Sequence, residues 1–102
     1  MMTREVSKLI ERIIWKVKHD CHKVPTNRIP DIDHEDCHWL HFGNDEVMTV
    51  VSIGISERGV FARYCDPNSS LRDTTIRLSP VNDPATATAK VLCIIKDVID
   101  QL

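Results

Sequence analysis

The stretch that decides the fold covers residues 47–66 and reads VMTVVSIGISERGVFARYCD. Its first half alternates between two sets of side chains, which predicts a β-strand over residues 47–56. The set expected to face the core is Val47, Thr49, Val51, Ile53 and Ile55, and the opposite set is Met48, Val50, Ser52 and Gly54. Residues 57–59, Glu-Arg-Gly, then predict a three-residue hairpin loop with its glycine in the left-handed conformation, followed by a return strand over residues 60–66.

Upstream of this hairpin, an apolar stripe at helical spacing predicts an amphipathic helix with Thr3 as its N-cap. The stripe consists of Val6, Leu9, Ile10, Ile13, Ile14 and Val17. Cys21 continues the stripe, so we expect a small buried side chain there.

Downstream, Asp83 and Pro84 predict the N-cap and first residue of a second helix. Its expected buried stripe is Ala87, Val91, Ile94, Ile95, Val98 and Leu102. Cys93 points away from this stripe and is expected to be an exposed thiol.

The segments between these elements are less regular. Pro25 and Pro30 disfavour helical conformation before them, so residues 23–33 are predicted to be a loop. Residues 34–42 fit either a short helix capped by Asp33 or a strand that enters a turn at residues 43–45, and we favour the strand. A turn at residues 67–70 and a strand over residues 72–78 complete the pattern.

The expected fold is therefore α+β: a four-stranded antiparallel meander with N- and C-terminal helices packed on one face, in a single domain over residues 1–102. The other sheet face would then expose Met48, Val50 and Phe61. Because no element remains to cover this apolar patch, we expect a homodimer formed through it.

Composition is that of a globular protein, with 42% hydrophobic and 27% charged residues and a net charge of −2. Neither a signal peptide nor a membrane span is recognisable, so we expect a cytoplasmic protein with its four cysteines as thiols. The charge is uneven along the chain. Residues 1–28 carry seven Lys or Arg against three acidic residues, whereas residues 29–46 carry six acidic residues and no Lys or Arg. Most simply, the two segments neutralise each other; alternatively, they face different partners.

All five histidines and two cysteines lie between residues 19 and 41, a grouping that raises the question of zinc. The candidate ligands are His19, His22, His34, Cys37, His38 and His41. Neighbouring residues such as Cys37 and His38 diverge on any regular element, so the spacing is poor for chelation and we expect no cofactor. A zinc-stabilised module is the alternative. The nearby carboxylates would also favour charged imidazoles, as in a pH sensor.

No glycine-rich phosphate loop or nucleophile motif indicates an enzyme. A small enzyme would have to use Cys37 with His19, His22 or His34. Nucleic acid is not an expected partner, because Glu11 interrupts the basic helix face and the chain is acidic overall.

The feature that favours a function is Trp15, which lies opposite the apolar stripe of the first helix. It is either an anchor for another protein or covered by the 23–33 loop. We favour a non-enzymatic protein-binding module of the kind found among inhibitors, immunity and antidefence factors. The expected partner-binding residues are Lys8, Glu11, Trp15, His19, His22, Met48 and Phe61.

Overall fold

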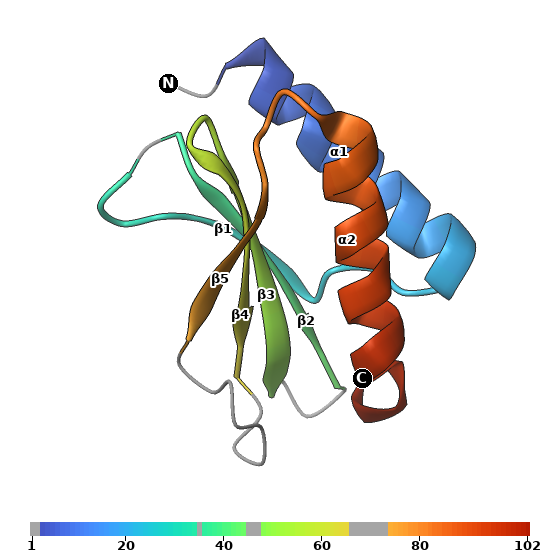
Figure 1. Ribbon diagram of the computed structural model, residues 1–102. Coiled ribbons are helices and arrows are strands. Elements are labelled where there is room, and N and C mark those ends of the chain that lie inside the picture. The colour runs from blue at the N-terminus through green and yellow to red at the C-terminus, as the bar shows by residue number, and fades with distance from the viewer. Residues whose placement is uncertain (1–2, 35, 45–47, 66–73) are drawn as a thin grey trace.

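The structure, a computed structural model, describes residues 3–34, 36–44, 48–65 and 74–102. Helix α1 (Arg4–Cys21) is followed by strands β1 (Asn27–Pro30), β2 (His38–Gly43), β3 (Thr49–Ser56), β4 (Gly59–Tyr64) and β5 (Thr75–Ser79). Helix α2 (Pro84–Val98) and a short 3-10 turn (Ile99–Gln101) end the chain. The fold is α+β, as expected, and both helices lie on one face of the sheet (Figure 1).

Both helices begin where the capping residues predict. The Thr3 hydroxyl accepts a hydrogen bond from the backbone N–H of Val6, and the Asp83 carboxylate accepts one from the N–H of Thr86. Each side chain satisfies an N–H group that has no partner within its own helix. Helix α1 ends at His22, which takes the left-handed conformation with φ 56°.

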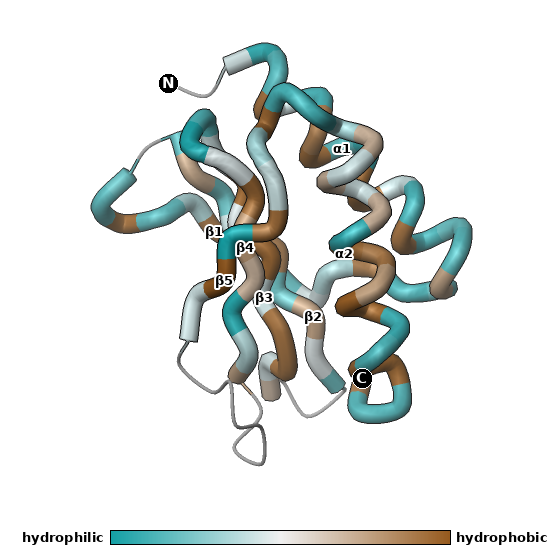
Figure 2. The backbone as a smooth tube through the Cα atoms, in the orientation of Figure 1, coloured by the Kyte–Doolittle hydropathy of each residue, from teal (hydrophilic) through white to brown (hydrophobic). Residues whose placement is uncertain are grey.

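The sheet is an antiparallel meander in the order β1-β2-β3-β4-β5. On the side facing the helices, β3 contributes Val51, Ile53 and Ile55, all fully buried. Neighbouring strands add Leu40, Phe42, Val60 and Ala62 to the same core. Figure 2 shows apolar residues recurring along β3 and along both helices, so one core fills the space between the two layers.

The sheet has five strands, not the four expected, because residues 27–30 form β1 inside the predicted loop. Arg28 pairs with Leu40 and Ile29 with Trp39. Pro30 is tolerated since it closes an edge strand, where a missing N–H breaks no ladder on the outer side. The prolines suggested a loop, but they are also compatible with an edge strand.

Two smaller expectations also need correction. Val50 is buried within the core cluster and is not part of the opposite sheet face, because the β2–β3 register shifts beside it. The β3–β4 hairpin has two residues between the paired Ser56 and Gly59, with Gly59 at φ 136°, so the predicted three-residue loop is one residue too long. The expected turns at 43–45 and 67–70 and the outer ends of three expected strands include residues outside the described ranges.

The two helices thus cover the same side of the sheet, and on the other side Asp31, from the segment that follows β1, lies against Trp39 (Figure 1). We call its other side the open sheet face; it carries Ile29, Trp39, His41, Ser52, Gly54, Phe61, Arg63, Thr75 and Arg77. No helix among the described residues has the length and apolar character needed to cross a bilayer.

Candidate functional sites

Trp15 lies on the outer side of α1 with 59% of its surface exposed. The 23–33 segment therefore does not cover it, so that alternative is wrong, and the role of Trp15 as an anchor for another protein stays a prediction. One helical turn further on, the His19 ring stacks on the indole at 4.9 Å between centroids and 9° between planes. The Lys16 ammonium lies 5.9 Å from the ring centroid on the same helix.

We call this surface the helix platform and define it as Trp15, Lys16, Lys18, His19 and His22. A shallow hollow of about 370 Å³ lies among Trp15, Lys18, His19 and His22. Its position at the end of α1 follows from the helical spacing of these residues and from the left-handed turn at His22.

Asp20 fixes two members of the helix platform. Its carboxylate lies 2.8 Å from Nδ1 of His19 and 3.5 Å from Nζ of Lys16. The hydrogen bond with His19, reinforced by Lys16, holds the pKa of Asp20 below its usual value. Asp20 holds both His19 and Lys16. The stacked rings of Trp15 and His19 therefore have a restricted geometry before any partner binds.

The other expected helix-face residues are exposed but separate from the helix platform. Glu11 pairs with Arg28 of β1 at 3.1 Å, so one carboxylate of the basic helix is neutralised by the first strand. Lys8 lines a different groove, of about 360 Å³, between α1 and the turn that precedes α2. The lining residues of that groove are Glu5, Lys8, Leu9, Arg12, Val81, Asn82 and Pro84.

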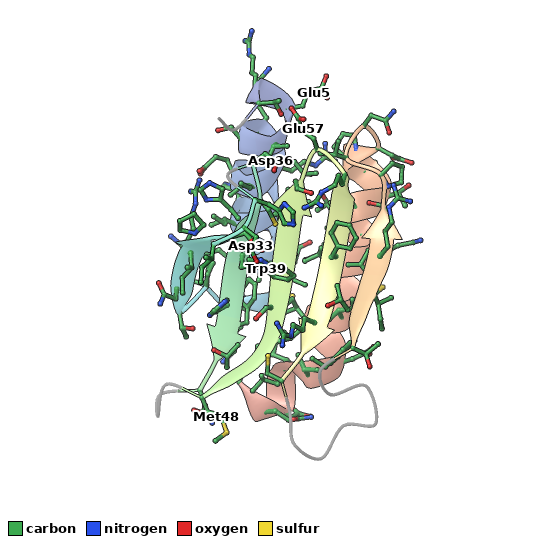
Figure 3. The ribbon with its side chains drawn as sticks, turned by 90° about the vertical axis from the view of Figure 1, so that its left-hand side faces the viewer. Glu5, Asp33, Asp36, Trp39, Met48 and Glu57 are labelled. Atoms are coloured by element: carbon green, nitrogen blue, oxygen red, sulfur yellow. The ribbon has the colours of Figure 1, made fainter. Side chains whose placement is uncertain are left out.

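The second tryptophan occupies the middle of the open sheet face (Figure 3). The six-membered ring of Trp39 lies against Gly54, where an added Cβ would come within 2.8 Å of Cζ3. Phe61 pairs with Gly54 from the other side. The indole N–H donates to the Asp31 carboxylate at 2.9 Å, and this bond keeps the pKa of Asp31 below its usual value.

Shallow hollows lie on both sides of Trp39. One, of about 220 Å³, is lined by Asp31, His34, Cys37, Trp39, Arg58, Phe61 and Thr75. The other, of about 210 Å³, is lined by Trp39, His41, Thr49, Ser52, Arg63 and Cys65. Both are open depressions, which suit a flat macromolecular partner better than an enclosed small molecule.

The six candidate metal ligands are spread over the molecule. His19 and His22 lie on the helix platform. His34 and Cys37 line one hollow on the open side of the sheet, and His41 lines the other. His38 lies beside the core residues Leu40 and Ile55. Within the described ranges, no three His, Cys, Asp or Glu side chains gather as they would around a metal ion. The zinc alternative thus stays a prediction that the side-chain placement does not support.

Burial, and not the nearby carboxylates, shifts the pKa values of the sheet histidines His38 and His41. Desolvation, with a contribution from Arg28, lowers the pKa of His38, whose buried Nδ1 has no hydrogen-bond partner within the described residues. Burial alone lowers the pKa of His41. This direction is opposite to the one proposed from the acidic composition of the segment.

Burial also determines how readily a cysteine thiol of this chain loses its proton. Cys37 is buried, and desolvation together with Asp31 raises the pKa of its thiol. Its backbone N–H donates to the carbonyl of His34, so this Cys/His pair, one of the three that a small enzyme would need, is joined through backbone atoms. Cys21 is buried and Cys93 exposed, as the helix patterns predict.

Of the expected sheet residues, Met48 is 58% exposed at one end of the sheet, and Phe61 is half-buried at the centre of the open sheet face. Trp39 and Arg63 were not among the expected site residues. The glycine inside a strand pattern at Gly54 was the available signal, because such a glycine often marks a close approach by another group. Comparisons of the chain with protein-family models, curated proteins and solved structures give no match.

Proposed function

We propose that this chain is a non-enzymatic protein-binding module that holds its partner through the helix platform. The observation that carries the proposal is the exposed Trp15, held in place by His19 and Lys16 on a rigid helix. Large aromatic side chains are the commonest anchors of protein interfaces, and a fixed ring loses little conformational entropy on binding.

The charge around Trp15 indicates an acidic partner surface. Two acidic residues of α1 are neutralised internally, Glu11 by Arg28 and Asp20 by Lys16 and His19. Four basic residues on α1, namely Arg4, Lys8, Arg12 and Lys18, have no ion-pair partner among the described residues. They would attract an acidic protein and orient it on the helix.

The thiols support the non-enzymatic part of the proposal. Burial disfavours the thiolate of Cys37, which is the reactive form of a nucleophilic cysteine. All four cysteines are free thiols, which fits a reducing compartment, so the proposal places the protein in the cytoplasm as an inhibitor or immunity-type factor. Capture by the helix platform needs no cofactor.

The test begins with affinity purification from host lysate, using the wild type, Trp15→Ala and Val24→Ala as matched baits. Val24 is a comparable control, because it is also apolar and 57% exposed. A protein retained by wild type and Val24→Ala but lost with Trp15→Ala is then purified, and its affinity is measured by calorimetry.

We expect Trp15→Ala to weaken this binding about 30-fold, or about 2 kcal/mol, as for other aromatic anchors. Its thermal unfolding should match that of the wild type, and affinity should fall with salt because the basic residues steer the partner. Equal retention of the partner by Trp15→Ala and wild type would show that binding uses a different surface.

A further inference from the structure

We propose that the groove between α1 and the turn before α2 binds an acidic peptide segment, with one apolar side chain on its floor and a carboxylate between Lys8 and Arg12. The inference deepens the proposed function and rests on it for the origin of the segment, which belongs to the partner held by the helix platform. Three observations carry it: the apolar floor of the groove, its two unpaired cations and its position on α1.

The floor of the groove is apolar, because the N-terminal half of α1 meets the connection from β5 to α2 there (Figure 1). Leu9 is 2% exposed and belongs to the core, and Val81 is half-buried against the same core. Pro84, the first residue of α2, adds its ring to the lining. The volume of about 360 Å³ lies in the lower range of ligand-binding hollows, so the groove has room for an aliphatic side chain.

Lys8 and Arg12 bring two positive charges to the groove, one helical turn apart on α1. Neither has an ion-pair partner among the described residues, so the two cations repel each other at positions i and i+4. Glu5 is the acidic residue that also lines the groove. The nearby Asp83 is engaged in the α2 cap, where its two carboxylate oxygens accept hydrogen bonds from the N–H and the hydroxyl of Thr86.

The lining residues of the groove therefore carry two positive charges and one negative charge. A carboxylate between Lys8 and Arg12 would relieve their mutual repulsion, and their aliphatic stems would widen the apolar floor. A ligand that complements this arrangement carries an apolar side chain next to a carboxylate, as an acidic peptide does.

The open shape of the groove favours a segment of a protein over a small molecule. Five of its seven lining residues are exposed, namely Glu5, Lys8, Arg12, Asn82 and Pro84. A ligand in the groove keeps one side in water, whereas small-molecule pockets surround most of their ligand. Among the described residues, no aromatic side chain lines the groove, so a nucleic acid base would find no ring on which to stack.

The position of the groove connects it to the helix platform. Lys8 precedes Trp15 by seven residues, so the two side chains project from the same side of α1, two turns or about 10 Å apart. An extended segment covers this distance with about three residues. A partner anchored on Trp15 therefore needs only a short acidic segment to reach the groove, and this gives Lys8 a role in binding although it lies outside the helix platform.

The test uses a probe of defined sequence and therefore does not require the partner. The peptide Glu-Asp-Leu-Asp-Glu, acetylated and amidated, is titrated into the full chain, and the backbone amide shifts are followed by NMR. We expect saturable shifts around Lys8 and Val81, with a dissociation constant of about 1 mM. Replacing the leucine of the peptide by glycine should raise this constant by about tenfold or more, because the apolar floor then stays in contact with water.

Variants of the chain test the two cations. Lys8→Gln and Arg12→Gln should each raise the dissociation constant about threefold, and the double variant about tenfold, since each change removes one charge from beside the carboxylate. Lys96→Gln is the matched control: it removes an exposed lysine near the other end of α2, and it should bind the peptide like the wild type. Circular dichroism checks that each variant is folded.

The absence of saturable shifts up to about 10 mM peptide, or equal affinity of the double variant and the wild type, would overturn the inference. So would tighter binding of hexanoate or of a single-stranded oligonucleotide at the same residues, which would assign the groove to a small carboxylate or to a nucleic acid. These failures would leave the proposed function standing, because capture through Trp15 is measured separately with host lysate. Peptide binding at the groove, together with a partner that Trp15→Ala retains, would overturn the role of the helix platform and not the groove.

Discussion

The two tryptophans show two ways in which this chain positions an aromatic side chain. Trp15 is held by its own helix: His19 stacks on it, Lys16 approaches it, and 59% of its surface remains exposed. Trp39 is held by distant parts of the chain. Its ring lies against Gly54 of the neighbouring strand, and its N–H donates to Asp31 in the preceding loop.

The difference separates a residue available for binding from one that also supports the fold. The contacts of Trp15 come from one helical turn, so removing the indole leaves the core intact. The contacts of Trp39 join β2, β3 and the loop that leads into β2, so removing it leaves an uncovered glycine and a carboxylate without its donor.

The largest predicted effect follows directly. Trp39→Ala should lower the free energy of unfolding by about 3 kcal/mol, because a packed indole is lost from a tight contact. Trp15→Ala should change it by less than about 0.5 kcal/mol, as is usual at exposed sites. Urea denaturation at low micromolar concentration measures both without a contribution from self-association.

Gly54 provides the matched control for this comparison. Gly54→Ala should destabilise the wild type by about 1–3 kcal/mol, since the new Cβ would overlap the Trp39 ring. In the Trp39→Ala background the same change should cost almost nothing, because the ring is absent. Equal costs in the two backgrounds would contradict the contact between Gly54 and Trp39.

Local patterns were sufficient to predict the helix side of the molecule. The period of the apolar residues, the Thr3 and Asp83 caps, and the exposure of Trp15 all follow from neighbours within one or two turns. The alternation in β4 and in residues 51–55 of β3 was equally readable, whereas Thr49 and Val50 before them lie on the faces opposite to those predicted.

The pairing register of the strands could not be predicted from the sequence. β1 is only four residues long, has all its residues exposed and ends in Pro30, so it lacks the apolar alternation that marks a strand. The site at Trp39 depends on the pairing of β2 with β3, which brings Gly54 beneath the ring. Val50 lies in the core and not on the expected sheet face because of a register shift, which the pattern of residues does not predict.

The comparison between the sheet and the helix platform also applies to the way in which stability depends on pH. Because the pKa values of His38 and His41 are lowered in the folded chain, the unfolded chain binds more protons below the unperturbed value of 6.5. Their contribution to stability is therefore complete above pH 6.5 and is lost as pH falls below it. We expect the melting temperature to fall between pH 7 and pH 5, before the carboxylates are protonated.

Replacing both residues in His38→Gln/His41→Gln should flatten this dependence, because glutamine does not titrate. The matched control is His19→Gln/His22→Gln on the helix platform, which keeps the sheet histidines and should keep the slope. Melting curves followed by circular dichroism at several pH values give the comparison. An unchanged slope in the sheet variant would show that other groups control the acid response.

The smallest predicted effect concerns the residue that ends the helix platform. His22 has φ 56°, a left-handed conformation that costs a side chain with a Cβ about 1–2 kcal/mol and costs glycine nothing. His22→Gly removes this cost but adds about 0.4–1 kcal/mol of backbone freedom to the unfolded chain. The net result should be a gain of about 0.5 kcal/mol in the free energy of unfolding, while the bond from the backbone N–H of residue 22 to the Lys18 carbonyl is kept. His22→Ala should give no gain, since alanine retains the Cβ, and a urea titration that ranked alanine above glycine would contradict a left-handed end to α1.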